Sequence, residues 1–431
     1  MHVGTTAVAC EREPLRAPFG FKGRTVTELW QVATRLDVDD GISGFGLGTQ
    51  SPLWSDAALF ERLGESESNR AMLRLTEFAL RECEGESFEH PFELFDRLYP
   101  RVLQQGRSML DLPGLRPTFA LNALVAVDNA AWQLLAATHG FQSFDDLIPN
   151  SCRPALPARH ASVGNIPLIS FGTPVSEAVQ AVSRGHAVLK IKIGSDPGRN
   201  GRQDEMLEWD CQRISELHTA LRDFRTPATT TGAVAYYLDA NSRYDSLERV
   251  QRLLDHCARI GALDRILLLE EPLSEDSDVD VSDLPVRVAA DESAHSIADV
   301  VRRIDAGYTA IALKPIAKTL SLSLRMAAEA HRRGISCFCA DLTVNPILVD
   351  WNKNVAARLP VLPGMNTAVF ESNGFQNYRD WPRMQSHHPL PGATWRDAGE
   401  GYYLLDQTFY AEAGGILRPS PHYRDLLAPS P

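Results

Sequence analysis

The chain has 431 residues, long enough for one barrel-sized domain and a smaller second domain. Its formal net charge of −12 and isoelectric point near 5.5 argue against nucleic acid and anionic membrane surfaces as partners. No apolar run approaches the ~20 residues of a membrane span, and scattered cysteines are typical of a reducing compartment. We therefore expect a cytoplasmic protein with no nucleic acid and no membrane partner.

Residues 1–150 are expected to form an α+β domain. The segments 24–36 and 42–50 are joined by the polar stretch 37–41, a pattern that predicts a β-hairpin. Three helical patterns follow, at about 69–84, 91–110 and 117–139. Strands followed by helices are typical of an α+β unit.

Beyond residue 150, short apolar runs alternate with helix-length segments. The runs lie at 166–172, 187–194, 233–241, 265–272, 286–293, 308–315 and 334–341, and an eighth is expected near 366–371. This alternation predicts parallel βαβ units, because parallel neighbours need a long crossover. A (β/α) barrel over residues 151–385 and a doubly wound open sheet would both satisfy it.

Polar residues at the ends of the runs favour the barrel. Nearly every run is apolar until its C-terminal end, where it carries ionisable or amide groups. In a parallel barrel these ends meet at one mouth, which is where barrel enzymes place their sites. In an open sheet the outer strands would lie too far apart to cooperate.

Two lysines interrupt the apolar run at 187–194. Side chains at alternate strand positions share a face, so Lys190 and Lys192 project together. Lysines in strands often only block edge pairing or keep a surface wet. This chain has only six lysines, however, and far more arginines. A buried lysine can act as a base when its pKa falls, whereas arginine stays protonated, so the pair suggests chemistry.

Three carboxylates, Asp239, Glu270 and Asp291, end three successive runs. They would repel one another unless a cation lay between them. All-oxygen ligands favour a hard ion such as Mg²⁺. Each acid alone could instead cap the next helix, but this explanation weakens for three in succession. The polar neighbours that could support these ligands are Asn241, Glu271 and Glu292.

The order of the motifs KIK, DAN, EEP, ADES and ALKP resembles the enolase superfamily. The resemblance is to its muconate lactonising enzyme subgroup, which includes dipeptide epimerases and N-acylamino acid racemases. It covers nearly the whole chain and implies a modified (β/α)7β TIM-like barrel with an α+β capping domain. Residues from about 386 to 431 are then expected to pack back on the cap.

The resemblance also implies roles for individual residues. Asp239, Glu270 and Asp291 would bind Mg²⁺. Lys192 and Lys314 would be acid/base catalysts on opposite faces of the substrate. Lys190 would lie near the substrate carboxylate and help to depress the pKa of Lys192.

The family's substrate-selecting elements correspond to further positions. Its capping loops match residues 19–23 and 48–54, in which Lys22 and Trp54 are candidate substrate contacts. Glu371 and Asn373 occupy the region where dipeptide epimerases place acids that bind the substrate ammonium. Asp341, at the end of the seventh run, could meet a cationic substrate or cap the following helix.

The implied function is a Mg²⁺-dependent racemase or epimerase. It would abstract the proton next to the carboxylate of an amino acid derivative or dipeptide, through an enolate, and we expect a homo-oligomer. A syn-dehydratase or cycloisomerase on the same scaffold is the alternative, and a non-catalytic binding barrel is a third reading. A His–Asp dyad of the mandelate racemase type is absent from the strand ends, which disfavours acid-sugar dehydration.

Three other features carry simpler expectations. The polar inserts at 195–206 and 222–232 are expected to form an extra loop beside the mouth. His387 and His388 lie in a proline-rich tail and are expected to be solvated. The cysteines that flank Phe338 are interpreted as packing residues rather than a metal site.

Overall fold

The computed structural model describes residues 1–21 and 23–428, which form two sheets. The first sheet has three antiparallel strands in the order β1-β2-β3. These strands are β1 (Val3–Phe21), β2 (Arg24–Val38) and β3 (Ser43–Gln50). The expected hairpin is confirmed as β2 and β3, which pair from Trp30 and Gln50 to Asp37 and Ser43.

Strand β1 was not expected from the sequence. It runs beside β2 from Val3 opposite Val38 to Phe21 opposite Arg24, with a shift in register between Pro14 and Phe19. Its prolines and charged residues obscure the usual strand pattern. An edge strand tolerates proline, because its outward N–H groups need no partner in the sheet.

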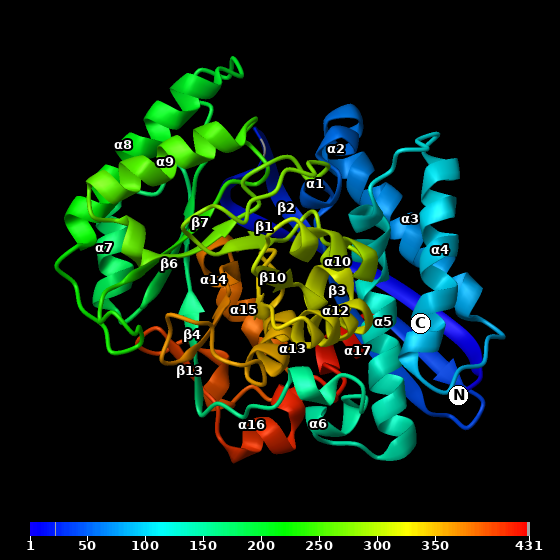
Figure 1. Cartoon of the computed structure of the whole chain (residues 1–431). Coiled ribbons are helices and arrows are strands. Elements are labelled where there is room, and N and C mark those ends of the chain that lie inside the picture. The colour runs from blue at the N-terminus through cyan, green and yellow to red at the C-terminus, as the bar shows by residue number, and fades with distance from the viewer. Residues whose placement is uncertain (22, 429–431) are drawn as a thin grey trace.

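Helices follow this sheet in the N-terminal unit. They are α1 (Pro52–Ser55), α2 (Ala57–Leu63), α3 (Glu65–Cys83), α4 (Pro91–Met109), α5 (Pro117–His139) and α6 (Phe144–Leu147). The three long helical patterns are thereby confirmed, and α3 and α4 lie on the right in Figure 1, in blue to cyan. Gly44 and Gly46 let β3 approach α5 closely, because a Cβ atom at either position would collide with the α5 backbone.

Helix α5 is the central helix of this unit. By length and composition it could cross a membrane, contrary to our expectation that no run is long enough. The whole apolar window is buried inside the protein, however, and α5 packs on β3, α3 and α4. Neighbouring elements bond the polar side chains of α5: Asn122 and Asn129 donate to carbonyls of β3, and Asp128 accepts from Ser321. Helix α5 is apolar on all of its faces because it is buried on all sides.

The second sheet forms the barrel. Its order is β13-β4-β12-β11-β10-β9-β8-β7-β6-β5. Its strands are β4 (Ser162–Ile166), β5 (Leu168–Ile169), β6 (Val188–Lys192), β7 (Ala235–Asp239), β8 (Ile266–Glu270), β9 (Val288–Ala290), β10 (Ala310–Leu313), β11 (Ser336–Cys339), β12 (Ala368–Glu371) and β13 (Tyr402–Leu404). Strand β4 pairs with β12 and β5 pairs with β6, while only Pro167 separates β4 from β5. The parallel strands therefore close on themselves, which excludes the open sheet.

Helices surround the barrel. They are α7 (Val175–Ser183), α8 (Gln203–Leu221), α9 (Leu247–Arg259), α10 (Ile297–Asp305), α11 (Pro315–Lys318), α12 (Leu320–Arg332) and α13 (Pro346–Ala356). Our expectation of strict alternation fails between β8 and β9, where residues 271–287 contain no helix. Pro272 and Pro285 flank a stretch rich in Asp and Ser there, a composition that favours turns.

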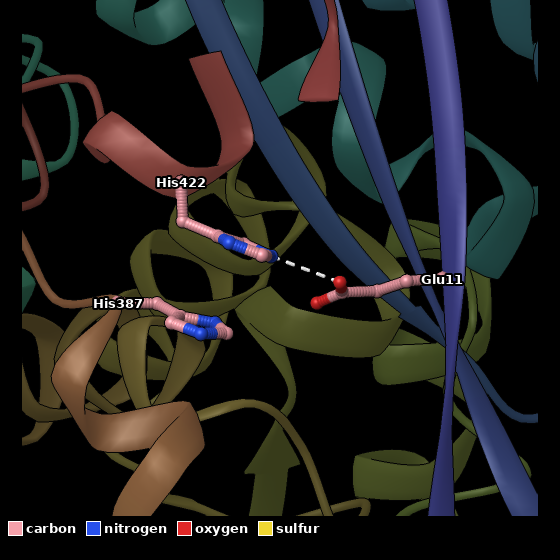
Figure 2. Close-up of side chains that lie close together, drawn as sticks. All are labelled: Glu11, His387 and His422. Carbon is pink, nitrogen blue, oxygen red and sulfur yellow. Dashed lines mark hydrogen bonds and ion pairs between the residues drawn. The ribbon is translucent and has the colours of Figure 1, made fainter. Parts of the chain in front are cut away.

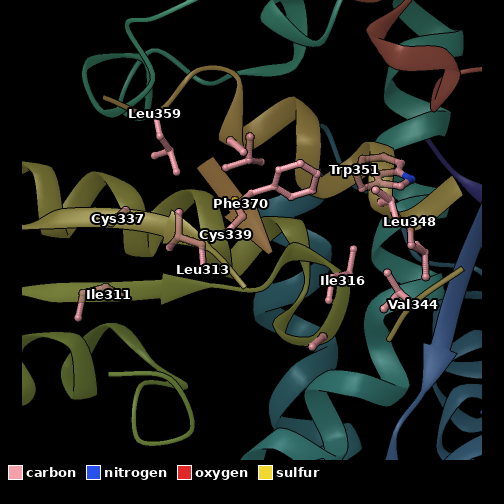
Figure 3. Packing of buried hydrophobic residues seen from close by; sticks show 14 of the residues in the cluster. Ile311, Leu313, Ile316, Cys337, Cys339, Val344, Leu348, Trp351, Leu359 and Phe370 are labelled. Atoms are coloured by element: carbon pink, nitrogen blue, oxygen red, sulfur yellow. The ribbon is translucent and has the colours of Figure 1, made fainter. Parts of the chain in front are cut away.

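The core between the strands and their outer helices is apolar. Ile311 and Leu313 of β10 belong to the same buried cluster as Phe370 of β12 (Figure 3). Cys337 and Cys339 of β11 lie in this cluster as well and form no disulfide. This placement confirms that the two cysteines are packing residues.

The C-terminal segment contains short elements. They are α14 (Gly374–Asn377), α15 (Trp381–Ser386), α16 (Gln407–Ala411), α17 (Pro421–Leu426) and the 3₁₀ turns η3 (Thr394–Arg396) and η4 (Ala413–Gly415). Two further 3₁₀ turns, η1 (Arg153–Ala155) and η2 (Leu263–Arg265), lie earlier in the chain. The segment contacts both units: β13 pairs with barrel strand β4, and His422 contacts Glu11 of β1. The division of the chain near residue 150 stays a prediction.

Two expectations about loops and the tail were wrong. Only the first insert, 195–206, begins at the mouth, because α8 carries the chain to the other end of the barrel before residues 222–232. His388 is not solvated: it is 2% exposed, and its Nε2 atom lies 2.9 Å from Asp350 of α13. His387 is half-buried.

Candidate active site

The site is built at the C-terminal ends of the barrel strands. Every residue of β6 is buried, and its two lysines share the inward face that alternation predicts. Lys190 is 3% exposed and Lys192 is 8% exposed. Two buried ammonium groups require carboxylate partners, because an unpaired buried charge is strongly disfavoured.

Lys190 lies among three carboxylates. Its Nζ atom is 3.0 Å from Asp239, 3.1 Å from Glu270 and 2.9 Å from Glu371. The same atom is 4.6 Å from the centre of the Tyr237 ring. Burial disfavours the ammonium, but the surrounding carboxylates outweigh burial and raise the pKa of Lys190. Lys190 therefore remains a fixed positive charge.

Lys192 and Lys314 lie on opposite walls. Lys192 Nζ is 2.6 Å from Asp239 Oδ2 and donates to Asn241 Oδ1. Lys314 directly follows β10 and donates to Asp291. Strands β6 and β10 are four positions apart in the sheet order. In a closed barrel of eight parallel strands, that separation places the two ammonium groups across the mouth from each other.

Carboxylates gather between the two lysines. Ligand oxygens of Glu270, Asp291 and Glu292 all lie within 4.8 Å of one another. Asp239, the third acid that we expected in the cluster, is instead paired with the lysines of β6. Glu270 Oε1 and Glu292 Oε2 are buried and have no hydrogen-bond partner among the described residues. Such oxygens suit a hard divalent cation, so the residues present fit Mg²⁺.

The pKa values of these acids differ with their neighbours. Burial raises the pKa of Glu270 to about 8, with Lys190 opposing the shift and Asp291 adding to it. For Asp239, Lys190 and Lys192 outweigh burial and lower the pKa to about 2. Lys314 and Lys318 likewise outweigh burial and lower the pKa of Asp291. Of Glu270, Asp239 and Asp291, Glu270 is thus the acid whose charge is least compensated by protein cations.

The three supporting candidates all lie at this site. Glu271 Oε2 accepts hydrogen bonds from the backbone of Asp291 and Ser293, at 2.7 and 3.2 Å, and so orients the loop after β9. Asn241 Nδ2 donates to Glu292 Oε1 over 2.9 Å. Glu292 therefore has one oxygen held by Asn241 and the other in the acidic cluster.

A cavity between the two units joins these groups. Its floor contains Lys190, Lys192 and Lys314 from the barrel. Its apolar wall comes from the N-terminal unit, whose lining residues are Phe19, Phe21, Val26, Leu29, Leu53 and Trp54. The two expected capping loops therefore reach the mouth, although Lys22 lies outside the described residues.

Trp54 of the N-terminal unit lies close to the catalytic candidate Lys314. Lys314 Nζ lies 4.6 Å from the centre of its ring. Its buried Nε1 atom has no hydrogen-bond partner among the described residues. The indole thus offers a ring face to the lysine and an unused donor near the cavity.

The acids of the last two strands are arranged differently from one another. Glu371 accepts from Lys190, from the backbone of Asp341 and from Asn373 Nδ2. Asp341 Oδ2 accepts from the backbone of Asn373 over 2.7 Å, while its buried Oδ1 has no partner among the described residues. Burial and Glu371 raise the pKa of Asp341 to about 7. Asp341 is therefore better placed than Glu371 to meet a group on a ligand.

Lys318 is a site residue that we missed. It is 0% exposed, and its Nζ atom lies 3.0 Å from Asp291 Oδ1. It also donates to the Asp291 carbonyl over 2.6 Å. Its position four residues after Lys314, on a second apolar turn, is the signal that could have identified it.

Comparisons with known proteins agree with this architecture. A search of curated proteins finds no match. A mandelate racemase/muconate lactonizing protein from Herpetosiphon aurantiacus is 20% identical with a TM-score of 0.62, covering 94% of this chain and 98% of its own. A dipeptide epimerase from Cytophaga hutchinsonii, solved with Mg and D-Ala-L-Val, is 17% identical with a TM-score of 0.61, at 88% and 89% coverage. These likenesses establish the fold.

A muconate lactonizing enzyme from Mycobacterium smegmatis, complexed with muconolactone, is similar to the same degree. It is 19% identical with a TM-score of 0.63, covering 88% of this chain and 90% of its own. Residues 174–381 match the family model described as enolase C-terminal domain-like. With the closed barrel and the lysine and carboxylate motifs, this match shows that the protein is an enzyme whose residues 174–381 belong to the family described as enolase C-terminal domain-like.

Proposed function

We propose that the protein is a Mg²⁺-dependent racemase or epimerase that acts next to a carboxylate. The observation that carries this proposal is the placement of Lys192 and Lys314 across one cavity. A lysine on each side of a carbon atom can remove a proton from one face and return it to the other. That sequence inverts the stereocentre.

The acidic cluster would hold the ion. Glu270 and Asp291 belong both to the ligands expected from the sequence and to the acidic cluster in the structure. Asp239 and Glu292 are further oxygen donors nearby. When bound, Mg²⁺ would supply positive charge that stabilises the enolate dianion formed from a carboxylate substrate. Asn241 and Glu271 keep these acids in place through the hydrogen bonds described above.

Each lysine has a distinct task in this mechanism. Lys190, held by three carboxylates, stays charged and lies beside the substrate carboxylate. Either Lys192 or Lys314 must be neutral to accept the proton. Asp291, Glu292 and Glu270 outweigh burial and raise the pKa of Lys314 in the protein alone. Neutralising those acids with a cation removes the cause of that rise, which lets the lysine release its proton.

The cavity walls suggest the substrate class. The apolar lining from the cap suits a side chain or acyl group, and the free oxygen of Asp341 suits an N–H donor. Amino acid derivatives and dipeptides carry both groups next to a carboxylate. We therefore propose substrates of this class that bear a small apolar substituent.

A library of dipeptides and N-acylamino acids in D₂O tests the proposal. The expected result is deuterium at Cα together with both stereoisomers of at least one substrate. Loss of water, or ring closure without exchange, would instead support a syn-dehydratase or cycloisomerase. The similar muconate lactonizing enzyme makes this the second candidate, because elimination needs only one lysine as the base.

A further inference from the structure

A second group of metal-ligating side chains lies outside the barrel mouth. It consists of Glu11 on β1, His387 directly after α15, and His422 in α17 (Figure 2). One ligand atom from each lies within 4.8 Å of the other two. None of the three lines the mouth cavity, so the group is separate from the catalytic site.

The contacts within the group are close but incomplete. His422 Nε2 lies 2.9 Å from Glu11 Oε2. The two imidazole rings stack with their centres 3.6 Å apart and an interplanar angle of 13°. The buried Nδ1 of His387 and Oε1 of Glu11 have no hydrogen-bond partner among the described residues. Figure 2 shows both rings directed toward the Glu11 carboxylate.

The backbone holds these ligands in place. Ser420 caps α17 and also donates its hydroxyl to the His387 carbonyl over 2.6 Å, which ties the two histidine segments together. Glu11 is fixed in the β1–β2 ladder opposite Gln31. The Tyr423 ring lies nearly perpendicular to both imidazoles. The ligands therefore come from a constructed pocket rather than a mobile tail.

Nearby charges leave the histidines able to bind a cation. Arg383, four residues before His387, forms ion pairs with Glu13 and Asp380. A neutral imidazole presents the nitrogen lone pair that a metal requires.

The ligand set selects the type of ion. Two imidazole nitrogens and one carboxylate suit Zn²⁺ and similar borderline ions, whereas Mg²⁺ prefers oxygen ligands. With metal–ligand bonds of about 2.0–2.1 Å, a tetrahedral ion holds its ligand atoms about 3.3 Å apart. Because a bound metal lies near the plane of each imidazole, the two rings must turn out of their nearly parallel stack before both nitrogens can reach one ion.

We propose that Glu11, His387 and His422 form a binding site for a Zn²⁺-type ion. The ion would fasten the C-terminal segment to the edge strand β1 of the N-terminal sheet. Its role is structural, since the site lies apart from the lysines and carboxylates of the mouth. This inference does not depend on the reaction that the barrel catalyses.

Titration of the full-length, tag-free protein tests the site. Mg²⁺ is kept in excess to occupy the oxygen ligands of the barrel, and Zn²⁺ or Co²⁺ is added while heat and the visible Co²⁺ spectrum are recorded. We expect one ion per chain, a tetrahedral Co²⁺ spectrum and a higher Tm with Zn²⁺. His387→Gln, His422→Gln and Glu11→Gln should each weaken binding at least about tenfold.

An exposed histidine provides the matched control. His331→Gln, on α12, should leave the affinity and the Tm shift unchanged. Circular dichroism and the metal-free Tm of each variant show whether it folds, so that lost binding is separated from lost structure. Absence of Zn²⁺ binding in the wild type, or equal affinity in wild type and folded His387→Gln and His422→Gln variants, would overturn the proposal.

Discussion

Lys190 donates a 2.9 Å hydrogen bond to Glu371 across the closing strand of the barrel. Glu371 ends β12, whereas Lys190 belongs to β6, and the β4–β5 segment lies between them. Glu371 also orients the backbone of Asp341. Its carboxylate is thus engaged by the protein before any substrate binds.

This relationship predicts different roles for the two acids. Asp341→Asn should raise KM for a substrate with a free ammonium by about tenfold or more, because a charged hydrogen bond contributes about 1.5–3 kcal/mol. Glu371→Gln should mainly lower kcat, since it frees Lys190. Steady-state kinetics with an amino substrate and its N-acyl analogue measure both effects. A KM change confined to Glu371→Gln would reverse the assignment.

The composition of the metal site gives a second prediction. Glu270→Gln should weaken Mg²⁺ binding at least about tenfold, because Glu270 lies in the acidic cluster and its buried Oε1 has no partner among the described residues. Comparing Asp239→Asn with Glu292→Gln by calorimetry identifies the third oxygen donor. Asp341→Asn, which changes an acid in the same cavity but outside the cluster, is the control. Normal Mg²⁺ affinity in Glu270→Gln would remove Glu270 from the ligand set.

The raised pKa of Glu270 predicts a pH dependence of stability. Its folded-state pKa of about 8 exceeds the ordinary 4.5, so the folded protein keeps a proton that the unfolded chain has released. In metal-free protein the free energy of unfolding should therefore fall as pH rises from 5 to 8, by up to about 1.4 kcal/mol per pH unit for each such group.

Asp341 and Glu271, each with a pKa raised to about 7, act in the same direction. Mg²⁺ should flatten the decline, and Glu270→Gln should make it shallower. Urea unfolding across this pH range, with and without Mg²⁺, provides the measurement. Stability that rises with pH in the metal-free protein would disagree with the account.

The unused donor of Trp54 leads to a prediction about substrate binding. Trp54→Phe keeps an aromatic ring beside Lys314 but removes the indole N–H. If this donor binds substrate, KM should rise about fivefold, corresponding to one hydrogen bond of about 1 kcal/mol. Tm should change little, because the protein supplies no partner to lose. Unchanged KM for all substrates would exclude this contact.

The sequence predicted the barrel strands best where an apolar run carries a site residue at its C-terminal end. The runs that end in Lys192, Asp239 and Glu270 could be placed because parallel strands bring their C-terminal ends together. Strand β1 could not be predicted, because its sequence lacks a clear strand pattern. Its extended conformation, which includes Pro14, depends on pairing with β2. The absence of a helix after β8 was also not predicted. The turn-forming residues of that segment resemble the polar sequence of an ordinary helical crossover.

Long-range contacts were the other limit. His388 looked like part of a polar tail, but Asp350 of α13 pairs with it in the interior. Glu292 was expected only to support the ligands, yet it lies in the acidic cluster because Asn241 fixes one of its oxygens. Such distinctions depend on side-chain directions that strand spacing does not specify.

Hydrogen exchange in the two lysine variants tests the central claim most directly. Each stereoisomer of an active substrate is incubated separately in D₂O with Lys192→Ala or Lys314→Ala, and deuterium at Cα is followed by NMR. We predict that neither variant interconverts the stereoisomers, and that each exchanges the proton of one isomer only, with opposite preference. Two-way interconversion by either variant would contradict the two-base mechanism, as would exchange of the same isomer by both.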